Sequence, residues 1–115
     1  MLHEDRIRVR RILEACDAVR SFIAGRNRED LNTDRMLLFA LARAIEIIGE
    51  AVGRISTAGQ GELPSVPWAF MAGMRNRLAH AYFEIDRDIL WRTASNSSLL
   101  SLTRFATSTP PTTTD

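Results

Sequence analysis

The stretch NTDRMLLFALARAIEIIGEAVGRIS, residues 32–56, decides the fold of this chain. Its apolar residues recur every three or four positions, which at about 100° per residue spreads them over one wide sector of a helix. They are Met36, Leu37, Ala40, Leu41, Ala44, Ile47, Ile48, Ala51 and Ile55. Asn32 and Thr33 are both capping residue types. We therefore predict one long helix from Asn32 or Thr33 to Ser56, with its apolar face packed against other helices.

The same helix has a charged face made of Arg43, Glu46, Glu50 and Arg54. Glu50 precedes Arg54 by four residues, the spacing of a favourable helical ion pair worth a few tenths of a kcal/mol. Two interpretations stay open: a solvated face, or a face with an electrostatic or partner-binding role. Gly49 sits in mid-helix, where glycine costs about 1 kcal/mol relative to alanine and often marks the close approach of another backbone.

Helical patterns also flank this segment, and no strand alternation is present. The first predicted helix runs from about Glu4 to Ala24 and stops at Gly25. The third starts at Pro67 or Trp68 and reaches His80 or Tyr82. The fourth follows Asp86, a suitable N-cap, and a short fifth spans 99–105 after the helix-poor run 96–98. Residues 26–31 and 57–65 are predicted connections.

The fold class that follows is all-α, an up-and-down four-helix bundle with a short additional C-terminal helix. Residues 1–105 form the predicted helical domain. The last predicted helix ends at Phe105. The ten residues that follow it, 106–115, have the sequence ATSTPPTTTD. They have no large apolar side chains to bury, so we predict a disordered tail. A chain of 115 residues is enough for one compact domain.

Composition excludes several classes of protein. The one cysteine rules out a disulfide framework and a cysteine-based zinc site, and its place in the stripe of the first helix predicts that Cys16 is a buried core thiol rather than a reactive one. The two histidines, with no Glu-x-x-His pair, argue against a di-iron bundle. No apolar run approaches about 18 residues and no leader pattern is present, so we predict a cytoplasmic protein without a membrane contact, cofactor or metal.

Positive charge is concentrated near the end of the third predicted helix. The formal net charge is only +1, and all 15 basic residues are arginine, which a GC-rich genome explains. Between Glu62 and Glu84, however, there is no acidic residue, while Arg75, Arg77 and His80 lie there. This gives a local positive field of the kind that a phosphate group would feel.

The third predicted helix also has a polar face opposite its core stripe of Met71, Met74 and Leu78. Gly73, Asn76 and His80 lie on that face, and Asn76 and His80 are four residues apart and can meet. Arg75 precedes His80 by five residues, about 140° away on an ideal helix. The two converge more easily if the helix loosens near His80 or if a second copy of the chain contributes. Alternatively, His80 is a structural residue at a helix end.

The run RNRLAHAY, residues 75–82, resembles the R-x4-H-x-Y motif of the HepT-like ribonucleases, which belong to the HEPN superfamily of small helical toxins. The resemblance extends over most of residues 4–105. IIGEA at 47–51 resembles the second-helix signature of the family, and VPW at 66–68, GMRN at 73–76 and ID at 85–86, followed by Trp91, resemble its pattern around the active helix.

The resemblance implies a metal-independent endoribonuclease. In this reading His80 acts as general acid or base for attack of a ribose 2′-hydroxyl on the adjacent phosphate. Arg75 would hold that phosphate by forked hydrogen bonds, and Asn76 would orient His80 or the substrate. Arg77 is either a substrate-steering charge or a solvated one. Tyr82 corresponds to the acceptor of AMP groups in the family, or is a half-buried tyrosine with a solvated hydroxyl.

The implied partners are an RNA substrate, a nucleotidyltransferase antitoxin of the MntA type that transfers AMP to Tyr82, and a second copy of the chain. The protein would then be the toxin of a type VII toxin–antitoxin system. The small residues Ala72, Gly73 and Ala79 would allow the close approach of a twofold partner. Two alternatives stay open: a non-catalytic helical adaptor that binds a nucleotidyltransferase or nucleotides, and a purely structural dimerising bundle.

Overall fold

A computed structural model describes the backbone of residues 1–79 and 86–96, with side chains for 1–73 and 86–96. These ranges contain helices and connections and no strand, which confirms the all-α class. The helices are α1 (His3–Ile23), α2 (Asp30–Thr33), α3 (Arg35–Val52), α4 (Thr57–Gly61), α5 (Trp68–Ala79) and α6 (Arg87–Ala94). The predicted helix 99–105 and tail 106–115 lie outside the described residues.

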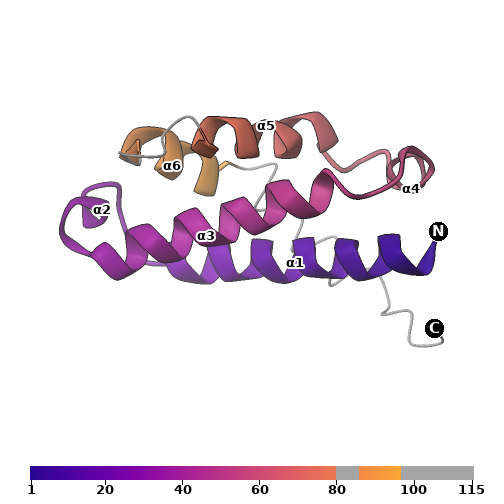
Figure 1. Ribbon diagram of the computed structural model, residues 1–115. Helices are drawn as coiled ribbons and strands as arrows, with labels where there is room; N and C mark the ends of the chain where they lie inside the picture. Colours follow the sequence, from indigo (N-terminus) through magenta and orange to yellow (C-terminus); the bar gives the residue numbers. More distant parts are fainter. Residues whose placement is uncertain (80–85, 97–115) are drawn as a thin grey trace.

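The central helix is α3, with α1 along one side and α5 along the other (Figure 1). Its buried residues are Leu37, Leu38, Leu41, Ala44, Ile45, Ile48, Gly49, Ala51 and Val52. They form one core with α1, α5 and α6, and this core is consistent with the predicted helical bundle. None of the helices in the described part of the chain is both long and apolar enough to span a lipid bilayer.

The predicted cap of α3 was one or two residues too early, and its predicted end was four residues too late. The cap is Asp34, whose carboxylate accepts a hydrogen bond of 3.0 Å from the backbone N–H of Leu37, and not Asn32 or Thr33, which belong to α2. This bond holds the pKa of Asp34 below its ordinary value of 3.8. At the other end α3 stops at Val52, because Ser56 caps a separate short helix, α4.

Helix α1 has nearly the predicted bounds and ends before Gly25, whose φ of 72° suits glycine alone among common residues. Its stripe of Ile12, Cys16 and Val19 is buried against α3. Cys16 has no exposed surface, and burial raises the pKa of its thiol to about 12. The prediction of a buried core thiol is confirmed, and Cys16 is protonated at neutral pH and therefore unsuited to act as a nucleophile.

The connections predicted as loops each contain a short helix. Before α2, Asn27 and Asp30 exchange hydrogen bonds, since the Asn27 N–H donates to the Asp30 carboxylate at 2.9 Å and the Asp30 N–H donates to the Asn27 side-chain oxygen at 3.2 Å. Before α4, the Ser56 hydroxyl accepts a hydrogen bond of 3.0 Å from the Gly59 N–H. Local hydrogen bonds between side chains and backbone N–H groups therefore organise the start of both short helices, and in α4 the bond is an N-cap.

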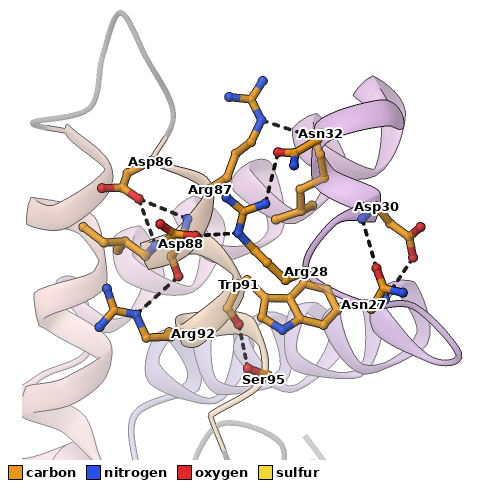
Figure 2. A network of polar contacts seen from close by, with 12 residues as sticks. Asn27, Arg28, Asp30, Asn32, Asp86, Arg87, Asp88, Trp91, Arg92 and Ser95 are labelled. Carbon is orange, nitrogen blue, oxygen red and sulfur yellow. Dashed lines mark hydrogen bonds and ion pairs between the residues drawn. The ribbon is translucent and has the colours of Figure 1, made fainter.

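Helix α6 is joined to α2 by a polar network (Figure 2). The Arg28 guanidinium donates to the Asp88 carboxylate at 2.6 Å, and that of Arg87 donates to the Leu31 carbonyl at 3.2 Å. The predicted cap is confirmed, because the Asp86 carboxylate accepts hydrogen bonds from the N–H groups of Asp88 and Ile89. Leu90 and Ala94 complete the burial of α6 in the core.

A buried carboxylate ties the start of α1 to the junction between α3 and α4. Asp5 is 2% exposed, and it accepts a 2.5 Å hydrogen bond from the Ser56 hydroxyl and a 3.1 Å bond from the Ser56 N–H. These bonds, the hydroxyl bond first, lower the pKa of Asp5 from its ordinary value of 3.8. A Cβ at Gly59 would lie 2.7 Å from the Asp5 carboxylate, so this position has room only for glycine.

We expect Asp5→Asn to destabilise the protein at neutral pH and to reduce its sensitivity to acid. Because the pKa is lower in the folded state, the ionised carboxylate stabilises the fold above about 3.8, and this contribution is lost as the pH falls through the folded-state pKa. Denaturant unfolding at about pH 7 and about pH 3 measures both effects. Asp17→Asn, at an exposed position of α1, is the control. Equal losses of stability with pH in wild type and Asp5→Asn would contradict the prediction.

Candidate functional site

The predicted site residues fall on α5 and directly after it. Arg75, Asn76 and Arg77 lie within the helical backbone of α5, as predicted, and their side chains are outside the described residues. His80 and Tyr82 also lie outside the described residues. The predicted start of this helix is confirmed, since α5 begins at Trp68, directly after Pro67.

The first half of α5 is firmly anchored to the rest of the protein. The Trp68 indole N–H donates to two backbone carbonyls at the end of the preceding segment, that of Gln60 at 3.1 Å and that of Leu63 at 3.0 Å. One turn later, Met71 has no exposed surface and lies in the core that α5 shares with α3. The helix that carries the motif therefore has a fixed orientation on α3.

The opposite side of α5 is open at its middle. Ala72 is exposed and Gly73 is half-exposed, and a Cβ built at Gly73 would meet no atom within 4 Å. These are two of the small residues predicted to allow the approach of a second copy. Within the described chain nothing covers them, so this part of α5 is sterically accessible to a substrate or a partner.

A shallow hollow of about 360 Å³ lies between α5 and α6. It is lined by Phe70, Ile89, Arg92, Thr93 and Asn96. Arg92 is held there by its own helix, because its guanidinium donates to the Asp88 carbonyl at 3.5 Å. This hollow places one cation and several apolar groups beside the helix that carries the predicted catalytic residues.

A larger groove lies between α1 and α3, and the sequence revealed only one side of it. Its volume is about 430 Å³. We call it the arginine groove; it is lined by Arg8, Arg11, Glu14, Ala15, Arg43, Ile47, Glu50, Ala51 and Arg54. Three residues of the predicted charged face, Arg43, Glu50 and Arg54, line it, and Glu46 does not. The α1 side could have been found from the spacing of Arg8, Arg11 and Ala15, which share one helical face.

The IIGEA signature at 47–51 divides between the core and the arginine groove. Ile48, Gly49 and Ala51 are buried, whereas Ile47 and Glu50 are half-buried and line the groove. Among the described residues, no three His, Cys, Asp or Glu side chains are grouped so that they could hold a metal ion. The groove is instead lined by four arginines and two glutamates.

Comparisons with known proteins identify the family. The family model described as "Ribonuclease HepT-like" matches residues 12–108, a range that includes α5 and the whole of the motif at 75–82. A probable ribonuclease HepT of Thermococcus cleftensis is 42% identical over 82 residues, which is 71% of this chain and 74% of that protein. A putative RNase of Methanocaldococcus jannaschii is 40% identical over 81 residues, 70% of this chain and 74% of that protein.

A third relative, a putative RNase of Caldanaerobacter subterraneus, is 38% identical over 82 residues, 71% of this chain and 73% of that protein. No solved structure gives a significant match. The family match and the three relatives agree with the resemblance drawn from residues 75–82, and the prediction of a ribonuclease is confirmed at the level of the family. This chain belongs to the HepT-like ribonuclease family.

Proposed function

We propose that this protein is a metal-independent endoribonuclease and the toxin of a type VII toxin–antitoxin system, acting in the cytoplasm. The observation that carries the proposal is the position of the motif RNRLAHAY at 75–82. It lies within the residues that match the family and begins on α5, the helix anchored by Trp68 and Met71. Family relatives carry the names of ribonucleases, which supports RNA as the substrate.

In the proposed reaction, a ribose 2′-hydroxyl attacks the adjacent phosphate and the 5′-oxygen of the next nucleotide leaves. His80 takes the proton from the hydroxyl or gives one to the leaving oxygen, a role suited to imidazole because it titrates near neutral pH. Arg75 binds the phosphate and stabilises the extra negative charge of the transition state. Asn76 orients His80 or the substrate, and Arg77 attracts the RNA strand.

The proposed regulation acts through Tyr82. A partner nucleotidyltransferase of the MntA type transfers AMP from ATP: the phenolic oxygen attacks the α-phosphorus, loses its proton, and pyrophosphate leaves. The added adenylate brings bulk and negative charge two residues from His80 and occupies the space that an RNA phosphate needs. The positive charges of Arg75 and Arg77, which bind the RNA phosphates, then attract the negatively charged phosphate of the adenylate.

The proposed assembly is a twofold homodimer. The open face around Ala72 and Gly73 supports it, because small side chains let two helices approach closely. In a contact of this kind the same surface of α5 meets itself, so two copies of the motif come together in one cleft. The second copy would also supply the convergence that a five-residue spacing between Arg75 and His80 does not give on one ideal helix.

We expect the purified protein to cleave single-stranded RNA in the presence of EDTA and to leave 2′,3′-cyclic phosphate ends. The cyclic end follows from attack by the 2′-hydroxyl, so a substrate with a single 2′-deoxy nucleotide before the cleaved bond should resist cutting at that bond. Mass spectrometry of the products and gel analysis of the two substrates measure this.

Two results would contradict the proposed activity: cleavage that EDTA abolishes, or equal cleavage of the 2′-deoxy substrate. RNA or nucleotide binding without cleavage, weakened by Arg75→Ala, would instead favour the non-catalytic adaptor. The absence of both cleavage and binding would favour the structural dimer.

A further inference from the structure

The arginine groove between α1 and α3 gathers four arginines of a chain that is nearly neutral overall. Four arginines and two glutamates line it, which gives a net charge of +2, against +1 for the whole protein. The groove is separate from the helix that carries the proposed catalytic residues, because α3 lies between α1 and α5 (Figure 1). Charge gathered in a concave surface attracts anions more strongly than the same charge spread over a convex one.

Two of the four arginines are already engaged by the protein. The Arg8 guanidinium donates to the Arg54 backbone carbonyl at 3.0 Å, across the end of the groove. Arg43 forms an ion pair of 3.1 Å with Glu46 on its own helix. Arg8 also lies 4.0 Å from the Glu4 carboxylate. The charges of both arginines are therefore offset by carboxylates that do not line the groove.

The other charged groups of the groove have no partner among the residues that the structure describes. In the part of the chain described by the structure, the guanidinium groups of Arg11 and Arg54 form no hydrogen bond or ion pair. The same holds there for the carboxylates of Glu14 and Glu50. The groove therefore presents both forked donors and strong acceptors that are free to meet a ligand.

Apolar groups complete the lining. Ala15 and Ala51 are buried, Ile47 is half-buried, and all three line the groove. The volume of about 430 Å³ lies within the range of about 300 to 1,000 Å³ that is usual for small-molecule sites. A ligand of this size would touch cations, carboxylates and an apolar surface at once.

We propose that the arginine groove binds one ribonucleotide unit, either as part of an RNA strand or as a free nucleotide. The phosphate oxygens accept hydrogen bonds from Arg11 and Arg54, and a ribose hydroxyl or base amino group donates to Glu14 or Glu50. The face of the base lies on Ile47. Inorganic phosphate would leave the carboxylates unused and exposed to repulsion, so the mixed lining favours the whole nucleotide over a simple anion.

If the bound ribonucleotide is part of an RNA strand, the inference rests on the proposed ribonuclease function. If it is a free nucleotide, the inference does not depend on that function. An RNA strand held in the groove would contact α3, the helix on which α5 also packs. The groove would then raise the affinity of the protein for RNA through nucleotides that lie away from the cleaved bond. Each phosphate neutralised by arginine also makes binding to a single strand dependent on salt, with a slope of about −0.7 per phosphate in log affinity against log salt.

The test uses the full chain carrying His80→Ala in every sample, so that binding is measured without cutting. Affinities for 5′-AMP, inorganic phosphate and a short oligoadenylate are measured by calorimetric titration and fluorescence anisotropy. The test variant is Arg11→Ala with Arg54→Ala. Its matched control is Arg10→Ala with Arg35→Ala, which removes the same charge from exposed positions of α1 and α3 that do not line the groove. Melting curves confirm that both variants fold.

We expect the test variant to bind AMP at least tenfold more weakly, and the control to bind it as the parent does. Glu50→Ala should weaken AMP binding without weakening the binding of phosphate. If oligoadenylate binding falls in parallel and its salt slope decreases by about 0.7, an RNA strand is the source of the nucleotide. If only AMP binding falls, a free nucleotide is the source.

Three results would overturn the proposal: no detectable binding of either AMP or oligoadenylate, equal affinities for both probes in the test variant and its control, or phosphate binding as tight as that of AMP and unweakened by Glu50→Ala. Failure of the proposed ribonuclease function is distinguishable, because it appears as absence of cleavage by the protein with His80 intact while AMP binding in the groove persists.

Discussion

His80→Ala is expected to abolish detectable RNA cleavage, with the cleavage rate lowered by about 10² to 10⁴-fold. The methyl group of alanine can neither accept the proton of the attacking 2′-hydroxyl nor protonate the leaving oxygen. The loss should appear in the rate of the chemical step and not in the affinity for RNA, because binding is assigned to Arg75 and Arg77. Single-turnover cleavage with the enzyme in excess separates the two quantities.

The chain supplies a matched control for this substitution. Its other histidine, His3, is exposed at the first residue of α1, so His3→Ala removes the same side chain outside the motif and should leave cleavage unchanged. Equal activity of the His80→Ala variant and the wild type would eliminate His80 as a catalytic residue. A loss of cleavage in both variants would point to a nonspecific effect on the fold, which melting curves detect.

Tyr82→Phe is expected to make the protein fully resistant to its partner nucleotidyltransferase while cleavage continues. Phenylalanine keeps the ring and lacks only the phenolic oxygen that accepts AMP, so the packing of the segment is preserved. Incubation with the partner and ATP should add AMP to the wild type and stop its cleavage. The same incubation should leave the mass and activity of the variant unchanged.

The amino-acid composition allows the AMP acceptor to be identified without ambiguity. Tyr82 is the single tyrosine of the chain, so AMP found on tyrosine can only be attached there. Intact-mass analysis before and after incubation, followed by peptide mapping, measures the site and the number of AMP groups. Continued modification of the Tyr82→Phe variant would show that another side chain is the acceptor. Modification of wild type without loss of cleavage would reject the proposed blocking mechanism.

The long helices were predictable from sequence because their signals are local. The apolar stripe of α1 and its stop before Gly25, the start of α5 after Pro67 and the cap of α6 at Asp86 all depend on residues within one or two turns. The ends of α3 were not predictable in the same way. Three residues of capping type follow one another at 32–34. The first two belong to α2, so the third, Asp34, is the N-cap of α3.

The contacts that join the helices were beyond sequence analysis. The Asp5 carboxylate meets Ser56 across 51 residues, and no local pattern distinguishes this acid from the exposed Glu4 beside it. The arginine groove was not predicted. The sequence indicated only the charged face at 43–54, because the other wall of the groove comes from α1. By contrast, the motif at 75–82 was found directly, because its residue types and their order carry the resemblance without any knowledge of packing.

The polar network between α2 and α6 also bears on the order in which the protein assembles. The contact between Arg28 and Asp88 closes a chain loop of 60 residues, whereas α1 and α3 are separated along the chain only by the short connection that contains α2 and pack on each other as a helical hairpin. Loop closure costs more entropy as the loop lengthens, so the hairpin can collapse early and α6 docks late. On a nascent chain, α1 and α3 would therefore be complete and able to pack together before α6 is synthesised.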